Sequence, residues 1–310
     1  MTKIGGTSLD VFPLCLGGNV FGWTADESES FAVLDAYEAA GGNFVDTADV
    51  YSAWVPGHAG GESETIVGRW MAARGNRGRI VVATKVGMLK GLERLTARTV
   101  RAAAEASLRR LQSDRIDLYY AHVDDAATPL EETLAAFDAL VREGRVRHVA
   151  ASNYTGARLA EALELSRRLG VARYVALQPH YNLVHRGGYE GGLADLCGRE
   201  GLACFPYYAL ASGFLSGKYR PGAKVASARA AGAEKHLDAR GLRVLAALDA
   251  IAAERGTTVA AVSLAWLLAR PGVVAPIASA RTPEQLRDLL PSVALRLRDD
   301  ERARLDDASS

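Results

Sequence analysis

The chain has 310 residues, 49% of them hydrophobic, so it can bury a large core either as one α/β barrel or as two ordinary domains. Its 37 Lys and Arg against 36 Asp and Glu leave a formal net charge of +1, which argues against a broad electrostatic surface for nucleic acid or anionic membranes. No linker-like tract divides the chain, and this favours a single domain over residues 1–310.

The sequence shows neither a signal-peptide pattern at its start nor a membrane-spanning run. The first residues lack the apolar segment of a signal peptide, and the most apolar later run, residues 257–269, is too short to span a bilayer. Cys15, Cys197 and Cys204 are odd in number and lack metal-type spacing, so we interpret them as buried small apolar residues. We therefore expect a cytoplasmic protein without membrane or nucleic-acid partners.

Strand and helix patterns alternate along the whole chain. Residues 80–82, Ile-Val-Val, are typical of a strand covered on both faces, and glycines follow most of the helical segments. The strands expected in chain order cover residues 13–16, 44–46, 79–85, 116–122, 146–153, 174–178, 202–207 and 273–277. The helices expected cover residues 30–40, 62–74, 96–111, 129–143, 155–169, 192–200, 238–255, 258–269 and 282–290.

Eight strands alternating with helices in about 300 residues predict an α/β fold of the (β/α)8 TIM-barrel type. The main competitor is a doubly wound sheet. It is disfavoured because Gly17-Gly18-Asn19 does not extend into a Gly-x-Gly-x-x-Gly fingerprint. One loop, from about residue 208 to 237, is unusually long for such a barrel.

Polar residues follow nearly every expected strand at its C-terminal end, where barrel enzymes keep their catalytic groups. A capping role explains Ser152, Asn153 or Ser279 taken singly. It does not explain an acid, a lysine, a histidine and a tyrosine on neighbouring strands. The residues at or just past the strand ends are Asn19, Asp46, Lys85, His122, Ser152, Asn153, Gln178, Tyr207, Ser279 and Arg281.

Four of these neighbours suggest a proton donor for an oxygen that gains negative charge. Tyr51 lies in the loop after Asp46, and an unperturbed phenol has a pKa of about 10, so it needs a nearby cation to stabilise its phenolate. Lys85 can supply that charge, and Asp46 can hold Lys85 in place, so that Asp46 acts only through the lysine. His122 can hydrogen-bond to the substrate oxygen and orient it.

The motifs that carry these residues resemble the aldo-keto reductase family. Asn-Phe-Val-Asp-Thr-Ala-Asp-Val-Tyr at 43–51, Ala-Thr-Lys at 83–85 and Tyr-Tyr-Ala-His at 119–122 are similar to its signature segments. The resemblance implies an NADPH-dependent oxidoreductase that converts a small-molecule aldehyde or ketone to an alcohol. It implies Tyr51 as general acid, Lys85 as its pKa modulator, Asp46 as the lysine's partner and His122 as the orienting group.

The resemblance also implies a cofactor site. Ser152 and Asn153 would hold the carboxamide beside Gln178, and Tyr207 would stack on the nicotinamide. The segment with Leu210, Ser212 and Lys218 would cover the pyrophosphate. Arg281 would take the 2′-phosphate, so NADPH is expected over NADH. Other expected cofactor contacts are Gly18, Asn19, Asp46, Ser279, Gln285 and Asp288.

The sequence departs from the family pattern at three places. Ser279 stands where glycine is common, Asp288-Leu289 replaces Glu-Asn, and Tyr208-Ala209 replaces Ser-Pro. Aromatic residues in the predicted active-face loops are costly unless they line a pocket, so they are expected to form the substrate pocket. These aromatic residues are Phe21, Trp23, Trp54 and Phe214.

Three other functions remain to be weighed. Asp124-Asp125 suggests glycosidase carboxylates, but adjacent residues point apart and suit capping. His180, His185 and Glu190 match no compact metal motif, so no metal is predicted. The alternative to an enzyme is an NADPH-binding regulatory or redox-sensing protein with slow turnover, similar to potassium-channel β subunits. The particular carbonyl and the oligomeric state are not predicted.

Overall fold

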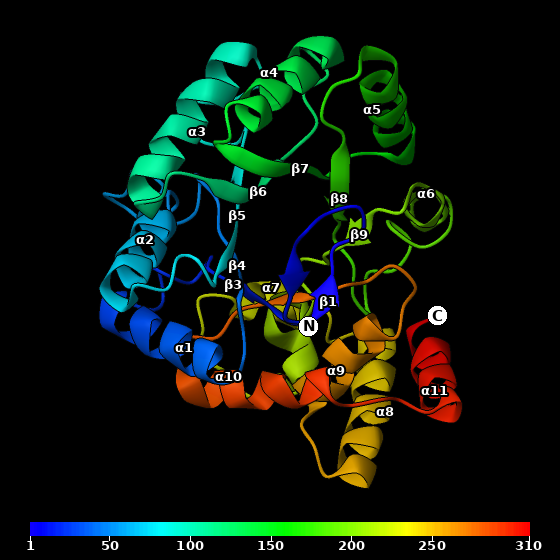
Figure 1. The fold of residues 1–310 in the computed structure, drawn as a ribbon. Helices are drawn as coiled ribbons and strands as arrows, with labels where there is room; N and C mark the ends of the chain where they lie inside the picture. The colour runs from blue at the N-terminus through cyan, green and yellow to red at the C-terminus, as the bar shows by residue number, and fades with distance from the viewer.

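Eight parallel strands form one curled sheet with helices on its outer side, in a computed structural model that describes residues 1–310 (Figure 1). The strand order is β10-β3-β4-β5-β6-β7-β8-β9. This confirms the predicted (β/α)8 fold class. The strands are β3 (Cys15–Gly17), β4 (Phe44–Asp46), β5 (Val81–Val86), β6 (Ile116–Ala121), β7 (Val146–Ser152), β8 (Tyr174–Gln178), β9 (Ala203–Cys204) and β10 (Ile277–Ala278).

The last two strands are shorter than expected. β9 covers two residues of the expected 202–207, and β10 begins four residues later than the expected 273. The reason is that Pro206 and Pro276 have no N–H to give to the ladder. The chain still follows the strand path, because Cys204 N–H donates to Gly272 O at 2.9 Å and Val274 N–H donates to Cys204 O at 3.0 Å. These bonds join the two edges of the sheet.

The helices between strands lie close to their expected positions. α1 is the exception: it begins three residues earlier, because Asp26 and Glu29 form a capping box that the sequence reading overlooked. No single helix is long and apolar enough to cross a membrane; α8 and α9 meet that criterion only when joined, and they are bent by 98° at the break. The nine helices expected are α1 (Glu27–Ala39), α2 (Glu62–Arg74), α3 (Ala97–Leu111), α4 (Leu130–Arg142), α5 (Gly156–Leu169), α6 (Gly192–Glu200), α8 (Ala239–Arg255), α9 (Val259–Leu268) and α10 (Pro283–Leu289).

Several short elements were not expected. An antiparallel hairpin of β1 (Thr2–Lys3) and β2 (Asp10–Val11) precedes the barrel. Its residues Ile4, Leu9 and Val11 are buried in a 15-residue cluster with Phe44, Leu118 and Phe205, so the hairpin closes the N-terminal end of the barrel. The remaining additions are η1 (Ala211–Ser216) and α7 (Ala230–Glu234) in the long loop, and η2 (Leu290–Val293) and α11 (Asp299–Ser309) near the C-terminus.

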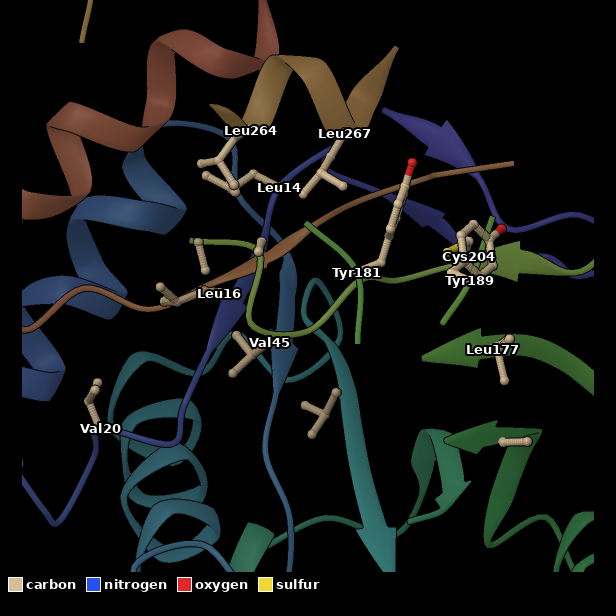
Figure 2. Close-up of a cluster of buried hydrophobic side chains, with 14 of the residues drawn as sticks. Leu14, Leu16, Val20, Val45, Leu177, Tyr181, Tyr189, Cys204, Leu264 and Leu267 are labelled. Atoms are coloured by element: carbon tan, nitrogen blue, oxygen red, sulfur yellow. The ribbon is translucent and has the colours of Figure 1, made fainter. Parts of the chain in front are cut away.

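Strand alternation divides the side chains between two cores. In β5, Val82 belongs to the larger, 68-residue cluster, whereas Val81 and Ala83 belong to the smaller cluster inside the barrel. Figure 2 shows part of the larger cluster, where Leu264 and Leu267 project from α9 toward Leu14. Because side chains repeat every second residue, Lys85 continues the inward row of Val81 and Ala83.

The same two-residue step places the other strand-end residues. Each lies two positions after a buried residue of the inner cluster, and therefore above it on the barrel axis. The pairs are Phe44 and Asp46, Tyr120 and His122, Ala150 and Ser152, Ala176 and Gln178, Phe205 and Tyr207, and Ile277 and Ser279.

Candidate active site

A buried lysine joins the residues that end β4 and follow it. Lys85 Nζ donates to Asp46 Oδ2 at 2.7 Å, to the Thr47 carbonyl at 2.7 Å and to the Tyr51 hydroxyl at 3.0 Å. The lysine side chain is fully buried, so three oxygen acceptors replace its hydration. The structure thus brings together the acid, the lysine and the phenol that the sequence suggested.

Asp46 also contacts the phenol directly, which the expectation that it acts only through Lys85 did not include. The Tyr51 hydroxyl donates to Asp46 Oδ2 at 3.2 Å. Burial, followed by the Asp46 carboxylate, raises the pKa of Tyr51 well above its usual value. Desolvation of the phenolate is the largest effect on this pKa, and it outweighs the lowering expected from Lys85. The phenol holds its proton at neutral pH.

His122 ends the inward row of β6 and faces the same cavity as Tyr51. The two rings lie at an angle of 71°, with centroids 6.3 Å apart. Burial, with the nearby Lys85 cation, lowers the pKa of His122 well below its usual value, so the imidazole is neutral. Its Nδ1 has no hydrogen-bond partner in the protein. A neutral imidazole keeps one N–H to donate.

A chain of side-chain amides and hydroxyls crosses the strand ends from β7 to β9. Tyr207 donates to Asn153 Oδ1 at 2.8 Å, and Asn153 Nδ2 donates to the His122 carbonyl at 2.8 Å. Ser152 Oγ donates to the Gln178 carbonyl at 2.9 Å. Gln178 Nε2 donates to Asp46 Oδ1 at 2.9 Å, which links this chain to the lysine cluster.

One cavity of about 610 Å³ connects these residues with the long loop and the β10–α10 segment. It is large enough for a cofactor together with a small substrate. Most of the expected cofactor residues line it: Asn19, Asp46, Ser152, Asn153, Gln178, Tyr207, Leu210, Ser212, Lys218, Ser279, Arg281, Gln285 and Asp288.

Gly18 is the expected cofactor residue that does not line the cavity. Its N–H donates to the Asp46 carbonyl at 2.7 Å, and its own carbonyl accepts from Ser63, so it lies behind the strand end. Gly17 lines the cavity instead. A Cβ on Gly17 would lie 2.7 Å from Ser279 Oγ, so the missing side chain makes room for a serine that itself donates to Asn19 at 2.6 Å.

Three cations line the cavity, and none of them pairs with a carboxylate: Lys218, Arg229 and Arg281. Arg229 was not predicted, because a single arginine in a long Ala- and Gly-rich loop carries no motif. Its Nη2 donates to Asn19 Oδ1 at 3.0 Å, and its guanidinium lies 5.5 Å from the Trp23 ring centroid. Burial lowers the pKa of Arg229. Such a site suits an anion with several oxygens.

Two of the four aromatic residues predicted for the substrate pocket do not line the cavity, so the prediction is wrong for them. Phe21 is fully buried, because a tight turn in which Val20 O accepts three N–H groups folds its ring against the core. Phe214 is also fully buried; it packs on His236 and against Gly241 of α8, and so fastens the long loop to the barrel.

The two tryptophans differ in position. Trp54 lines the cavity and is 49% exposed, so its role as a pocket wall stays a prediction. Trp23 lines a neighbouring depression and makes an edge contact with Trp54, with centroids 5.5 Å apart. Trp23 therefore packs against Trp54 without lining the cavity itself. Sequence reasoning missed Met88 and Tyr208, which line the cavity and are 48% and 49% exposed.

The residues considered as metal ligands or glycosidase acids have other partners. His180 stacks on His185, with centroids 3.8 Å apart, and Glu190 accepts from Tyr181 at 2.7 Å and Arg186 at 2.9 Å. No group of three or more His, Cys, Asp or Glu side chains is arranged to hold a metal. Asp124 accepts from Arg158, and Asp125 accepts from Leu95 and Thr128 near the start of α3 and α4.

Comparisons with known proteins agree with this geometry. A sequence model of the Aldo/keto reductase family matches residues 13–310. The uncharacterized oxidoreductase YrpG of Bacillus subtilis is 35% identical over 96% of this chain and 91% of its own. Norsolorinic acid reductase stcV of Emericella nidulans is 33% identical over 96% of this chain and 78% of its own.

A third relative is a probable voltage-gated potassium channel subunit beta of Oryza sativa subsp. japonica. It is 33% identical over 92% of this chain and 88% of its own. Members of the family typically use nicotinamide cofactors, and several relatives are named as oxidoreductases or reductases. The match over nearly the whole chain and the strand-end geometry lead to one conclusion: the chain belongs to the aldo/keto reductase family, a family of oxidoreductases.

Proposed function

We propose that this protein reduces an aldehyde or ketone to the alcohol, with NADPH as reductant and Tyr51 as general acid. The observation that carries the proposal is the Tyr51 hydroxyl, which lines the cavity while a fully buried ammonium, Lys85 Nζ, donates to it at 3.0 Å. A cation at that distance stabilises the phenolate that remains once the proton has left.

Each of the four residues has a separate task. A carbonyl oxygen beside Tyr51 replaces Asp46 as the acceptor of the phenol proton. His122, neutral because it is buried, donates its N–H to the same oxygen and orients the carbonyl. Lys85 keeps its bond to the phenolic oxygen during the transfer, and Asp46 holds Lys85. The phenolate regains its proton from solvent.

The cavity fits a dinucleotide by the chemistry of its lining. Amide and hydroxyl groups of Ser152, Asn153 and Gln178 suit a carboxamide, and Tyr207 offers a ring face. When bound, the nicotinamide supplies the hydride that ends on the carbonyl carbon. The balanced reaction consumes NADPH, the carbonyl compound and one proton and yields NADP⁺ and the alcohol.

The unpaired cations suit the phosphates of the same cofactor. Lys218 and Arg229 would hold the pyrophosphate, and Arg281 the 2′-phosphate, which favours NADPH over NADH. The backbone N–H of Arg281 already donates to Gln285 Oε1 at 3.0 Å, so its guanidinium is the available donor.

A binding role similar to that named for the rice channel subunit is the second candidate. The identity of 33% to that subunit supports it. Both candidates predict NADPH binding, and they differ in turnover: an enzyme releases product rapidly, whereas a sensor holds its cofactor and turns over slowly.

The decisive experiment follows loss of NADPH absorbance at about 340 nm over a panel of aldehydes and ketones. We expect the wild type to turn over and Tyr51→Phe to lose about 10²–10⁴-fold in kcat/KM, the usual contribution of a general acid. NADPH affinity, measured by fluorescence titration, should stay unchanged, because the phenol does not hold the dinucleotide.

Equal rates for wild type and Tyr51→Phe would reject Tyr51 as the acid. Tight NADPH binding with only slow oxidation for every carbonyl would favour the binding role instead. Tyr154→Phe is the matched control, since it removes a tyrosine hydroxyl that bonds to Tyr174 outside the cavity.

A further inference from the structure

Three of the six histidines of the chain lie near one another beside the end of β8: His180, His185 and His236. His180 follows Gln178 by two residues, so it continues the inward row of that strand. Neither His180 nor His185 lines the cavity. The proposed function so far gives these side chains no task.

The rings of His185, His180 and Tyr207 form a column. The centroids of the two imidazoles are 3.8 Å apart, with their planes at 11°. The centroids of His180 and Tyr207 are 5.3 Å apart, with the planes at 23°. Nearly parallel rings meet through their faces and not through their nitrogen lone pairs, so the histidines stack and do not form a metal site. Of the three rings, that of Tyr207 lines the cavity.

Backbone hydrogen bonds hold the column in place. The Tyr207 N–H donates to the Pro179 carbonyl at 2.9 Å, which pairs the chain at His180 with the chain at Tyr207. A tight turn follows, in which the His185 N–H donates to the Asn182 carbonyl at 3.0 Å and the Asn182 N–H donates to the His185 carbonyl at 3.2 Å. This turn brings His185 back over His180.

The Tyr207 ring is fixed from more than one side. Its hydroxyl donates to Asn153 Oδ1 at 2.8 Å, and one of its faces is covered by His180. The buried Asn182 donates to the carbonyl of the next residue, Tyr208, at 2.9 Å. The orientation of the phenol ring is therefore set by the segment after β8 as well as by its own hydrogen bond.

The column requires a neutral imidazole. Two charged rings at the separation of His180 and His185 would repel each other. Burial, followed by the neighbouring His185 and His236, lowers the pKa of His180 to about 4. His180 is therefore neutral at neutral pH, and its ring can stack on both neighbours.

From these contacts we infer that His180, backed by His185, is a positioning residue for the cofactor: its ring fixes the plane in which Tyr207 meets the nicotinamide. This role rests on the proposed function and deepens it, because it adds a residue that acts on the cofactor through Tyr207. A group that is fixed before binding has less freedom to lose when the ligand binds. The affinity for the nicotinamide half of the cofactor should therefore depend on His180.

The test compares two ligands by calorimetry: NADP⁺, and adenosine 2′,5′-bisphosphate, which lacks the nicotinamide. We expect His180→Leu, which fills the space without a flat ring, to weaken NADP⁺ binding about two- to tenfold, the size of an aromatic pair. It should leave adenosine 2′,5′-bisphosphate binding unchanged. His180→Phe should keep most of the NADP⁺ affinity, because it keeps a flat ring.

Two results would overturn the role of His180. One is an unchanged NADP⁺ affinity in His180→Leu, and the other is an equal loss for both ligands, which would point to a general disturbance of the site. His58→Ala is the matched control, since it removes an imidazole that lines the neighbouring depression and not the cavity. It should leave both affinities unchanged.

A double-mutant cycle shows whether His180 acts through Tyr207. In a Tyr207→Leu background, His180→Leu should weaken NADP⁺ binding no further, because the ring that it positions is gone. The same loss in both backgrounds would overturn the proposed route. His185→Ala changes an exposed side chain and should weaken NADP⁺ binding about twofold, less than His180→Leu, because it acts one ring further away. An unchanged affinity would overturn the part assigned to His185.

A last arm separates this role from the proposed function. If neither ligand binds to the wild type, the proposed cofactor fails, and NMR of the ligand-free protein decides the positioning of Tyr207 alone. The nuclear Overhauser contact between the Tyr207 ring and the Asn153 side-chain amide should be present in wild type and His180→Phe and lost in His180→Leu. The same contact in all three proteins would reject the positioning role.

Discussion

The cavity has one side made by strand ends and another made by loops, and the two sides are built differently. On the strand side, Asp46 and Lys85 are nearly or fully buried, and Gln178 and Ser152 join them in one hydrogen-bonded network. On the loop side, three residues of the segment after β9 have left-handed backbones: Tyr208, Ala211 and Ser212.

Side-chain contacts tie the loop side to the barrel. Phe214 packs against α8, and Arg229 donates to Asn19. Strand positions fixed by a sheet can hold reacting groups with little freedom, whereas loops can vary in shape without disturbing the fold. The difference assigns chemistry to the strand side and the choice of cofactor and substrate to the loop side.

The largest expected effect comes from a substitution on the strand side of the cavity. Lys85→Met should lower kcat/KM by about 10³-fold, because the phenolate loses its only ammonium neighbour. It also leaves Asp46 buried without its cation, a change that costs about 3–5 kcal/mol of stability for a buried pair. Steady-state NADPH oxidation and thermal unfolding measure the two effects.

A double variant keeps this prediction testable if the single variant fails to fold. Asp46→Asn with Lys85→Met removes both charges, so it should recover most of the stability while activity stays lost. Recovery of activity in the double variant would show that Lys85 serves only to neutralise Asp46.

Much of the strand side could be predicted from the sequence, because two simple rules determine it. Side chains alternate along a strand, and parallel strand ends meet at one end of a barrel. The residues after Val45, Thr84 and Ala121 therefore had to converge once the strands were recognised. What the rules could not give is the direct bond from Tyr51 to Asp46, since Tyr51 lies in a loop.

The loop side could not be predicted in the same way. Phe21 and Phe214 are apolar residues in loops, and the sequence cannot tell whether such a ring lines a pocket or packs beneath the loop. The structure places both in the core. Arg229 approaches Asn19 only because the long loop folds back across the barrel mouth, a tertiary contact between residues 210 positions apart.

Asp49 is the unsatisfied charge on the strand side, and it gives a pH-dependent prediction. Both of its carboxylate oxygens lack hydrogen-bond partners, and burial, with the Glu64 carboxylate nearby, raises the pKa of Asp49 from 3.8 to about 7. The folded state therefore binds this proton more tightly than the unfolded state, so stability falls as pH rises from about 4 to 7 and stays lower above that range.

Asp49→Asn should remove this loss. At pH 8 the variant is expected to be more stable than wild type by up to about 4 kcal/mol, the size of the shift, and the difference should vanish near pH 4. Denaturant unfolding at the two pH values measures it. Glu64→Gln is the contrast. Glu64 accepts hydrogen bonds from Arg110 and Thr84, so this substitution should lower the stability of the protein. If Asp49→Asn raised the free energy of unfolding equally at both pH values, the charge of Asp49 would not be the cause of the gain.

The smallest expected effects distinguish the roles of two arginines on the loop side of the cavity. Arg229→Ala should weaken NADPH and NADH about equally, roughly tenfold, because the pyrophosphate is common to both and one charge-assisted contact is worth about 1.5–3 kcal/mol. Arg281→Ala should weaken NADPH by a similar factor and leave NADH almost unchanged, because only NADPH carries the 2′-phosphate. Fluorescence titration of both cofactors measures the four affinities.

Arg220→Ala is the matched control for these two variants, since Arg220 lies on the same loop but pairs with Asp249 outside the cavity. It should leave both affinities unchanged. If Arg281→Ala weakened both cofactors alike, Arg281 would not read the 2′-phosphate. If Arg229→Ala instead spared both cofactors but lowered kcat/KM for one class of carbonyl, the guanidinium would belong to the substrate. In that case the loop side would select substrate and cofactor through different residues than proposed, while the strand side would keep its chemistry.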